Sequence, residues 1–383
     1  MEKIKLFQEV FGTLPTLDVS AAGRINLIGE HVDYCGGLVM PASLNLCCRV
    51  LARRNGTNFV NVYADDLKVT AKIDLNDLDA SRSLGWGKYQ AGVFDVMKKE
   101  GAPLVGCDML YSCTVPFGSG LSSSAAIEVA TAVAMNELTG NKYDLKETAV
   151  LCQKAENTYC GVNCGIMDQF ASAMGKKEKA ILLNCKTLEY EYIPFALGDY
   201  ELIVANCNKP HALVTSKYNE RRQEVEEALE KLQTVLPEAT CLADITPEAF
   251  EGAKHVLSGK ILDRAKHVVY ECARVKEAAA ALKAGDIATL AKLINASHDS
   301  LSKLYEVTGK EPDALAYAAR ETEGCIASRM IGAGFGGCTI SLVEKGKTEA
   351  FKQAVGKKYT LDTGYNAAFY DTSIEDGVKV EHL

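Results

Sequence analysis

A glycine- and serine-rich stretch places the strongest constraint on what this 383-residue chain can fold into. Residues 115–126 read Val-Pro-Phe-Gly-Ser-Gly-Leu-Ser-Ser-Ser-Ala-Ala, and the apolar residues that follow indicate a buried helix. Glycine lets the backbone approach a ligand closely, and the N–H groups at a helix N-terminus attract anions. The serine hydroxyls can cap the helix, bind phosphate oxygens or contact a metal ion. The stretch therefore predicts either an anion site or a serine-capped helix after a glycine turn.

Length and charge narrow the class of protein. A chain of 383 residues favours two domains, and 48% hydrophobic with 24% charged residues is typical of soluble globular proteins. The net charge of −8 argues against nucleic acid or an anionic membrane as the main partner. The sequence contains no signal-peptide core and no apolar run of about 20 residues. With fourteen cysteines, these features lead us to expect reduced thiols and a cytoplasmic location.

A second unusual stretch, residues 20–41, places charged residues between short apolar pieces that are broken by glycine. Arg24, Glu30, His31 and Asp33 lie close together in the sequence, which is uncommon for a solvated loop. Polar residues on loops held by a rigid scaffold often carry function. The alternatives are a functional cluster and the charged tip of a hairpin.

The remainder of the chain alternates between expected strands and helices. We expect strands at residues 44–54, 58–64, 109–115, 180–183, 201–207, 339–343 and, as the last strand, 366–371, with polar turns at 67–79. We expect helices before Gly12, from an opening at residues 85–89 to about residue 99, after the serines to about 139, from 144 to about 159, and at 216 onward, 262–283, 286–305, 312–322 and 346–357. A change of composition near residue 190 predicts two domains, 1–190 and 191–383. The second half indicates an antiparallel α+β layer.

Three further features allow more than one interpretation. Asp168 begins an apolar helix, where an acid is often a capping residue, but an ionised carboxylate there needs a cation such as Arg24. Trp86 is the only tryptophan, and it can stack on a base or pack in the core. Residues 332–337 match G-x-G-x-x-G but lead into an expected strand, so we interpret them as a tight turn and not as a dinucleotide site.

Taken in order, the three glycine-rich stretches resemble those of the GHMP small-molecule kinase family. Residues 23–34, Gly-Arg-Ile-Asn-Leu-Ile-Gly-Glu-His-Val-Asp-Tyr, closely resemble the galactokinase signature within it. Val32 and Cys35 depart from the commonest pattern, in which Thr and Asn are usual. The resemblance covers nearly the whole chain. It implies an α+β, two-domain GHMP architecture with a mixed-sheet N-terminal domain, an antiparallel α+β C-terminal domain and an active site in the cleft between them.

The resemblance also implies roles for particular residues. Asp168 matches the catalytic aspartate and Arg24 its cationic partner, while Ser124 and Glu156 match the residues that hold Mg²⁺. The positions that match the ATP-binding phosphate loop are Gly118, Ser119, Gly120, Leu121, Ser122, Ser123 and Ser124. The positions that match or flank the sugar-binding residues are Glu30, His31, Val32, Asp33, Gly165 and Tyr218. The third glycine-rich stretch would support this site from the second domain.

The activity implied is ATP-dependent phosphorylation of the anomeric hydroxyl of galactose, the entry step of galactose catabolism, by a monomeric enzyme. One alternative is a GHMP kinase for another substrate, such as N-acetylgalactosamine, mevalonate or homoserine, although residues 30–33 favour a sugar. Another is a non-catalytic galactose sensor. Such relatives lack a Ser-Ala pair in the phosphate loop, which is intact here as Ser124-Ala125. The motifs of P-loop NTPases and protein kinases are absent from the sequence.

Overall fold

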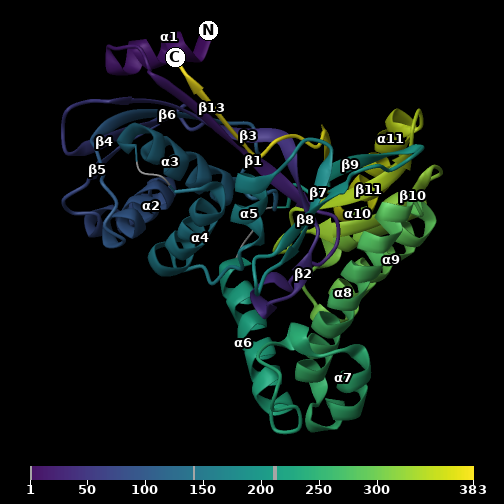
Figure 1. Cartoon of the computed structure of the whole chain (residues 1–383). Coiled ribbons are helices and arrows are strands. Elements are labelled where there is room, and N and C mark those ends of the chain that lie inside the picture. Colours follow the sequence, from purple (N-terminus) through teal and green to yellow (C-terminus); the bar gives the residue numbers. More distant parts are fainter. Residues whose placement is uncertain (1, 141–142, 210–213) are drawn as a thin grey trace.

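The structure is a computed structural model, and it describes residues 2–140, 143–209 and 214–383 (Figure 1). The first half of the chain is built on a six-stranded mixed sheet with the order β13-β1-β3-β6-β4-β5. Only β4 and β6 pair in parallel within this sheet as described. Its strands are β1 (Leu17–Asn26), β3 (Pro41–Arg54), β4 (Phe59–Ala64), β5 (Val69–Asp74), β6 (Cys107–Cys113) and β13 (Val378–His382).

Helices cover both faces of this sheet (Figure 1). The larger group packs on one face and buries an extensive apolar core beneath it. Its members are α2 (Lys88–Lys99), α3 (Ser123–Thr139), α4 (Leu145–Ala155) and α5 (Met167–Met174). On the other face α1 (Glu2–Phe11) packs Phe7 against Leu51 and Leu110. The start of α4 is fixed by a capping box in which Asp144 and Glu147 bond each other's backbone N–H, which confirms the expected N-cap.

The second half contains a four-stranded antiparallel sheet with the order β10-β11-β9-β12. Its strands are β9 (Tyr200–Asn206), β10 (Cys325–Ile331), β11 (Cys338–Glu344) and β12 (Ala368–Asp371). A small sheet of β2 (Leu38–Val39), β7 (Lys179–Asn184) and β8 (Tyr190–Pro194) lies between the two larger ones (Figure 1). The helices of this half are α6 (Val214–Leu232), α7 (Pro247–Ala253), α8 (Gly259–Ala284), α9 (Ile287–Ser300), α10 (Lys310–Arg320) and α11 (Thr348–Thr363). The expected α+β architecture is confirmed.

Several expected elements differ from the structure. Residues 17–26 form β1, although no strand was expected there, because small and charged residues obscure its alternation. Residues 69–74 form β5 where turns were expected, since this edge strand is polar and pairs only with β4. A further strand, β13, follows the expected last strand and pairs with β1, from Leu17 opposite His382 to Ala21 opposite Val378. The boundary at residue 190 stays a prediction, but this return means that the C-terminal strand completes the N-terminal sheet.

The cysteines differ from expectation at one pair. Cys48 on β3 and Cys113 on β6 lie directly opposite each other in the ladder and are joined in a disulfide. The expectation of reduced thiols throughout is therefore wrong for these two residues, because strand pairing brings together positions 65 residues apart in the sequence. The other cysteines within the described ranges are free. Among the described helices, none has both the length and the apolar character to cross a membrane.

Candidate active site

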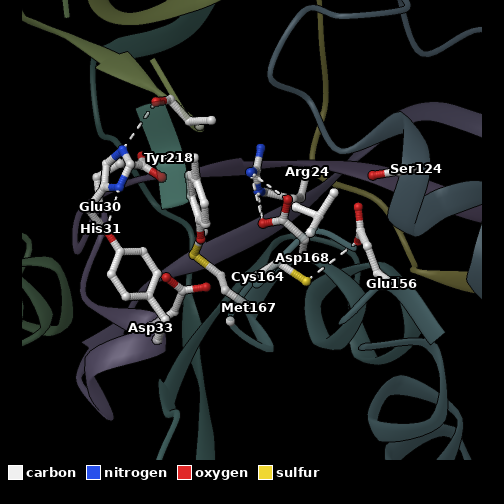
Figure 2. Close-up of a pocket in the computed structure, with 15 residues that line it drawn as sticks. Arg24, Glu30, His31, Asp33, Ser124, Glu156, Cys164, Met167, Asp168 and Tyr218 are labelled. Atoms are coloured by element: carbon white, nitrogen blue, oxygen red, sulfur yellow. Dashed lines mark hydrogen bonds and ion pairs between the residues drawn. The ribbon is translucent and has the colours of Figure 1, made fainter. Parts of the chain in front are cut away.

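A pocket of about 170 Å³ lies between the two halves of the molecule (Figure 2). Both halves contribute to it, as the two-domain prediction required. The predicted site residues that line it are Arg24, Glu30, His31, Asp33, Ser124, Glu156, Gly165, Asp168 and Tyr218. The lining residues that were not expected are Tyr34, Val162, Cys164, Met167 and Ala333, together with Gly332 of the third glycine-rich stretch.

Arg24 and Asp168 face each other at this pocket (Figure 2). Arg24 is buried on β1, and Asp168 lies in the first turn of α5. The guanidinium holds the carboxylate by two bonds, from Nε to Oδ1 and from Nη2 to Oδ2, each 2.9 Å long. The remaining Nη1 donates to the carbonyl of Gly120. A bidentate pair of this kind fixes the orientation of a carboxylate as well as its charge.

The phosphate loop reaches the same carboxylate. The hydroxyl of Ser122 donates to Oδ2 of Asp168, and Ser122 adopts a left-handed backbone with φ of 63°. Helix α3 begins at Ser123, so its first N–H groups have no carbonyl one turn earlier to bond. These N–H groups and the positive end of the helix dipole form a site that suits phosphate. Asp168 thus stands between an arginine and an anion-binding helix terminus.

The third glycine-rich stretch connects β10 to β11 and packs directly on the phosphate loop. A Cβ atom on Gly332 would lie 2.7 Å from the carbonyl oxygen of Gly120, and one on Gly337 would lie 3.0 Å from that of Ser119. Gly332 also has a φ of 79°, which side chains rarely adopt. The glycines are needed because two backbones touch here, and the interpretation as a turn before a strand is confirmed.

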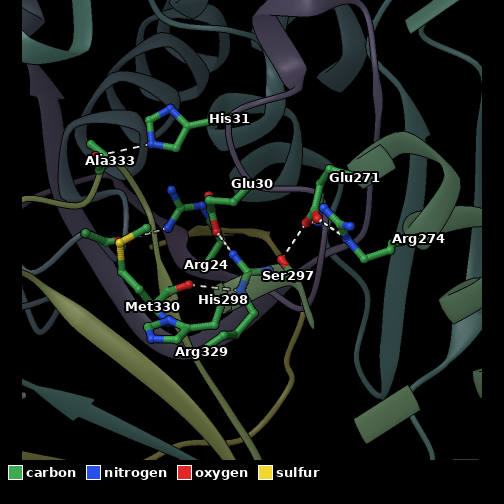
Figure 3. A network of polar contacts seen from close by, with 12 residues as sticks. Arg24, Glu30, His31, Glu271, Arg274, Ser297, His298, Arg329, Met330 and Ala333 are labelled. Atoms are coloured by element: carbon green, nitrogen blue, oxygen red, sulfur yellow. Dashed lines mark hydrogen bonds and ion pairs between the residues drawn. The ribbon is translucent and has the colours of Figure 1, made fainter. Parts of the chain in front are cut away.

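Glu30 is buried and forms an ion pair with Arg329 of β10, which is also buried (Figure 3). Burial raises the pKa of the Glu30 carboxyl above its ordinary value, although Arg329 and Arg24 act in the opposite direction. The loop that carries Glu30 is also tied to α8. Glu271 accepts the N–H of Gly29 at 3.0 Å, and Nε2 of His267 donates to the carbonyl of Glu30 at 3.1 Å. Residues far apart in the sequence thus hold this loop in place.

His31 has protein partners at both ring nitrogens. Its Nε2 lies 3.2 Å from the carbonyl of Ala333, which can only accept, so this nitrogen carries the proton. Its Nδ1 then accepts from the hydroxyl of Tyr34 at 2.8 Å, and that hydroxyl lies 2.8 Å from the hydroxyl of Tyr305. Burial lowers the pKa of His31 to about 3, so the ring is neutral. His31 therefore contributes ring surface to the pocket more than free hydrogen-bonding groups.

Asp33 and Tyr218 line another part of the pocket (Figure 2), and Gly165 lies against Asp33 there. A Cβ atom on Gly165 would lie 2.0 Å from Oδ2 of Asp33, so only glycine fits there. Burial, with the nearby charges of Asp168 and Glu30, raises the pKa of Asp33 to about 7. The ring of Tyr218, from α6, lies 5.6 Å from that of His31 between ring centroids. This wall offers carboxyl and phenol groups that suit the hydroxyls of a sugar.

Ser124 and Glu156 meet on the phosphate-loop side of the pocket. The Ser124 hydroxyl bonds the carboxylate of Glu156, which lies in a π-helical turn, Glu156–Cys160, at the end of α4. Gln169 donates from Nε2 to Glu156 at 2.6 Å and to the fully buried Glu128 at 3.1 Å. Neither carboxyl has a Lys or Arg partner within ion-pair distance in the described ranges. Two buried carboxyl groups without a cation are the setting in which a bound divalent ion would balance charge.

Not all of the predicted binding residues line this pocket: Ser124 is the one member of the predicted phosphate loop that does, and Val32 of the sugar signature does not. Val32 packs its side chain in the core, where it contacts Gly37, and it is not among the lining residues. The neighbouring His31 and Asp33 do line the pocket, so Val32 supports the loop from behind. Leu121 is likewise buried in an apolar cluster, although its carbonyl accepts the N–H of Arg24. The Ser119 hydroxyl is used locally, since it donates to the carbonyl of Pro116.

A second cavity, of about 240 Å³, lies beside the phosphate loop. Its walls are largely apolar, and they include Trp86, Tyr111 and Phe117. The ring of Trp86 packs edge-on against Tyr111 with centroids 6.4 Å apart, while one side of the indole remains at the cavity. Ser123 of the phosphate loop also lines this cavity. Both expectations for Trp86, core packing and a wall for a flat ligand, are compatible with this position.

The residue most clearly missed from the sequence is Arg329. It precedes the third glycine-rich stretch and lies within an otherwise apolar strand, which was a usable signal because a buried cation requires an anionic partner. Tyr34 and Tyr305 were missed for a different reason. Their hydroxyls meet across 271 residues of sequence, and no local pattern marks such a pair.

Comparisons with known proteins agree with this geometry. Residues 5–54 match the galactokinase galactose-binding signature, residues 88–176 the GHMP kinases N terminal domain, and residues 278–361 the GHMP kinases C terminal family. The galactokinase of Clostridium tetani is 45% identical over 97% of this chain and 95% of the relative. That of Clostridium acetobutylicum is 45% identical over 93% and 92%.

Solved structures show the same relationship. A crystal structure of Lactococcus lactis galactokinase complexed with galactose superposes with a TM-score of 0.96 at 40% identity, covering 99% of this chain and 98% of that one. A mevalonate kinase superposes with a TM-score of 0.66 at 17% identity, covering 94% and 99%, which shows a shared fold alone. With the signature, the cleft and these relatives in agreement, the chain belongs to the galactokinase family of GHMP kinases.

Proposed function

We propose that this protein transfers the γ-phosphoryl group of ATP to the anomeric hydroxyl of galactose, giving galactose 1-phosphate and ADP. The observation that carries the proposal is the position of Asp168. Its carboxylate faces a pocket of sugar size, and it is bonded both by Arg24 and by Ser122 of the phosphate loop. A nucleophile in this pocket and a phosphate at α3 would therefore meet beside one carboxylate.

Phosphoryl transfer depends mainly on positioning and charge stabilisation. In the mechanism we propose, Asp168 accepts the proton of the anomeric hydroxyl as that oxygen bonds to the γ-phosphorus and the bond to the ADP oxygen breaks. Arg24 orients the carboxylate through its two hydrogen bonds, and it stabilises negative charge that develops on the transferred group. The first N–H groups of α3 hold the phosphate oxygens.

The oxygen atoms of Ser124 and Glu156 suit Mg²⁺, which prefers a few protein oxygens with phosphate and water completing its shell. The uncompensated carboxyls of Glu128 and Glu156 support a cation at this point. Bound there, Mg²⁺ would neutralise charge on the phosphates. No cluster of three or more His, Cys, Asp or Glu side chains suited to a metal occurs in the described ranges, which agrees with a shell built largely from substrate and water.

We further propose that the sugar lies against Glu30, His31, Asp33, Gly165 and Tyr218, and that the base of the nucleotide occupies the cavity beside Trp86. The composition, the prevalence of free thiols and the complete single-chain cleft support a monomer in the cytoplasm. Galactose is favoured over N-acetylgalactosamine because the first glycine-rich stretch matches the galactose-binding signature. A non-catalytic sensor is disfavoured because Ser124, Glu156 and Asp168 all line one pocket.

A coupled assay of ADP release across a panel of sugars tests this proposal. The panel contains galactose, 2-deoxygalactose, N-acetylgalactosamine, glucose and mevalonate, each with ATP and Mg²⁺. We expect the highest kcat/KM with galactose. ADP release that is highest with N-acetylgalactosamine would reassign the substrate, and release with none of them, while galactose still binds by calorimetry, would indicate a sensor.

A further inference from the structure

A single buried glutamine distinguishes the cavity beside the phosphate loop from an ordinary apolar hollow. Gln90 lies in the first turn of α2 and lines this cavity, yet its residue is 0% exposed to solvent. Neither its side-chain oxygen Oε1 nor its nitrogen Nε2 has a hydrogen-bond partner among the described residues. Buried amides are nearly always paired, because an unpaired one loses its bonds to water without replacement. An amide free at both ends suggests a partner that is bound only when the enzyme works.

Three other polar side chains of the cavity, Tyr111, Asp66 and Thr114, already have partners within the protein. The hydroxyl of Tyr111 lies 2.7 Å from Oγ1 of Thr131, and the carboxylate of Asp66 accepts the N–H of Cys113 at 2.5 Å. The hydroxyl of Thr114 donates to the carbonyl of Cys47 at 3.2 Å. The remaining walls are largely aromatic and aliphatic, so they can hold the faces of a flat ring but cannot distinguish one ring edge from another. Gln90 has both a donor and an acceptor to offer an edge.

A carboxamide matches one nucleobase edge particularly well. Its oxygen can accept from the 6-amino group of adenine while its nitrogen donates to N7, and this bidentate pair discriminates by about 5- to 150-fold against a wrong base. A 6-oxo purine presents an acceptor where adenine presents a donor. Opposite Gln90, that purine would lose the bond to the oxygen.

We propose that Gln90 is a specificity-determining residue that reads the amino edge of the nucleobase in this cavity. The proposal rests on the proposed function, because it takes the nucleotide phosphates to lie at the start of α3. Ser123, which belongs to both the phosphate loop and the wall of this cavity, connects the two sites. Because the Gln90 amide is inaccessible before nucleotide binds, its side chain turns toward the cavity as the base enters, and adenine then supplies both missing bonds.

The test compares wild type with Gln90→Leu and with Gln90→Met, which preserves the unbranched shape. Calorimetry measures the Kd of ADP and of IDP, whose 6-oxo base lacks the amino group. We expect wild type to prefer ADP and both variants to bind ADP about 5- to 150-fold more weakly, with little change for IDP. Both variants should unfold at the same or a higher temperature than wild type without nucleotide, because an unpaired buried amide has been removed.

Two results would overturn the inference. One is an ADP Kd in both variants that stays within twofold of wild type, and the other is an equal loss for ADP and IDP with a lower unfolding temperature, which indicates a packing role. Gln233→Leu is the matched control, because its amide is bonded to the carbonyl of Ala239 at 2.8 Å on the remote α6–α7 side. These binding measurements need no turnover. A wild type that binds ADP in the expected way but phosphorylates no sugar would support Gln90 and refute the proposed function.

Discussion

The two ends of the cleft to which we assign the sugar and the nucleotide, here the sugar end and the nucleotide end, are built in opposite ways. The sugar end is buried, and Glu30 is paired there with Arg329 (Figure 3). The loop that carries Glu30 is also bonded to His267 and Glu271 of α8. The proposed nucleotide end is lined by residues within 64–127 alone, and its walls are largely apolar. Phe117 on its rim is 84% exposed, and Leu67 is 55% exposed.

The difference suggests that specificity is achieved differently at the two ends. At the sugar end the loop that carries Glu30 and His31 is held by an ion pair and hydrogen bonds within the protein, so this wall is in place before the ligand arrives. Such preorganisation reduces the ordering cost of binding. At the nucleotide end Gln90 remains unpaired and the rim is exposed, so affinity depends on contacts that form only with the ligand. Substitutions at the sugar end should therefore change the free energy of unfolding, whereas substitutions at the nucleotide end should weaken nucleotide binding.

The largest effect is expected where the two ends meet. Replacing Asp168 by Asn keeps its shape but removes the proton acceptor, so kcat should fall by roughly 10²- to 10⁴-fold. Galactose and ADP should still bind with Kd values close to those of wild type, because the walls of both pockets are unchanged. Stopped-time assays of ADP release and calorimetry measure these quantities. Turnover near that of wild type would remove Asp168 from the mechanism.

The second prediction concerns the buried ion pair of the sugar end. Arg329→Met leaves Glu30 buried without its cation, and loss of one partner from such a pair typically costs about 3–5 kcal/mol of unfolding free energy. Urea unfolding measures this change, and the KM for galactose should rise while the KM for ATP changes little. The control is Lys283→Met, which breaks an exposed pair with Glu191 and should cost less than about 1 kcal/mol. An equal loss of unfolding free energy in the two variants would mean that the buried pair stabilises the protein no more than the exposed one does.

The third prediction is a pH dependence that arises from Asp33. Its pKa is about 7 in the folded protein against an ordinary 3.8, so the folded state retains a proton that the unfolded state loses. The proton on Asp33 stabilises the folded state fully below about pH 4. This stabilisation declines as the pH rises and is lost above about pH 7, where the free energy of unfolding no longer changes with the titration of Asp33. Asp33→Asn should therefore gain stability over wild type between pH 4 and pH 8, by up to about 4 kcal/mol. Urea unfolding at several pH values measures the difference, and a constant difference would refute the buried protonated carboxyl.

The smallest effect is expected at the rim of the nucleotide end. Phe117→Ser removes an exposed side chain, so the unfolding free energy should change by less than about 0.5 kcal/mol. The Kd of ADP should nevertheless rise about two- to tenfold, because an aromatic contact with the base is lost. The Kd of galactose, measured in the same calorimeter, should stay constant. A clear loss of unfolding free energy with an unchanged Kd of ADP would show that the rim contributes to stability and not to nucleotide binding.

Much of this arrangement could be predicted from local sequence. Asp144 predicted a helix start because the capping box lies within four residues, and the serines after Gly120 predicted the start of α3 for a similar reason. The glycines at 332–337 predicted a turn, and their position before a strand excluded a dinucleotide site. The family resemblance then indicated that Arg24 and Asp168 belong together, which the bidentate contact agrees with.

Other features depended on partners that no short window contains. The strand β13 forms because β1 offers it an edge more than 350 residues earlier in the chain, and Cys48 meets Cys113 because β3 and β6 pair. Gln90 gave no signal, since a glutamine in the first turn of an amphipathic helix usually faces solvent. The packing of α2 against its neighbours, which include α3 and α4, buries it, and only the full set of neighbours shows that its amide is unpaired.

The sequence by itself determined the caps, the turns and the residue types that suit phosphate and sugar, because these depend on backbone dihedral angles and chemistry within a few residues. The tertiary structure decided which of those residues share a pocket, and it placed Val32 in the core while its neighbours line the site. It also decided which polar groups are already paired. Burial and pairing depend on every neighbour at once, and those neighbours come from the whole chain.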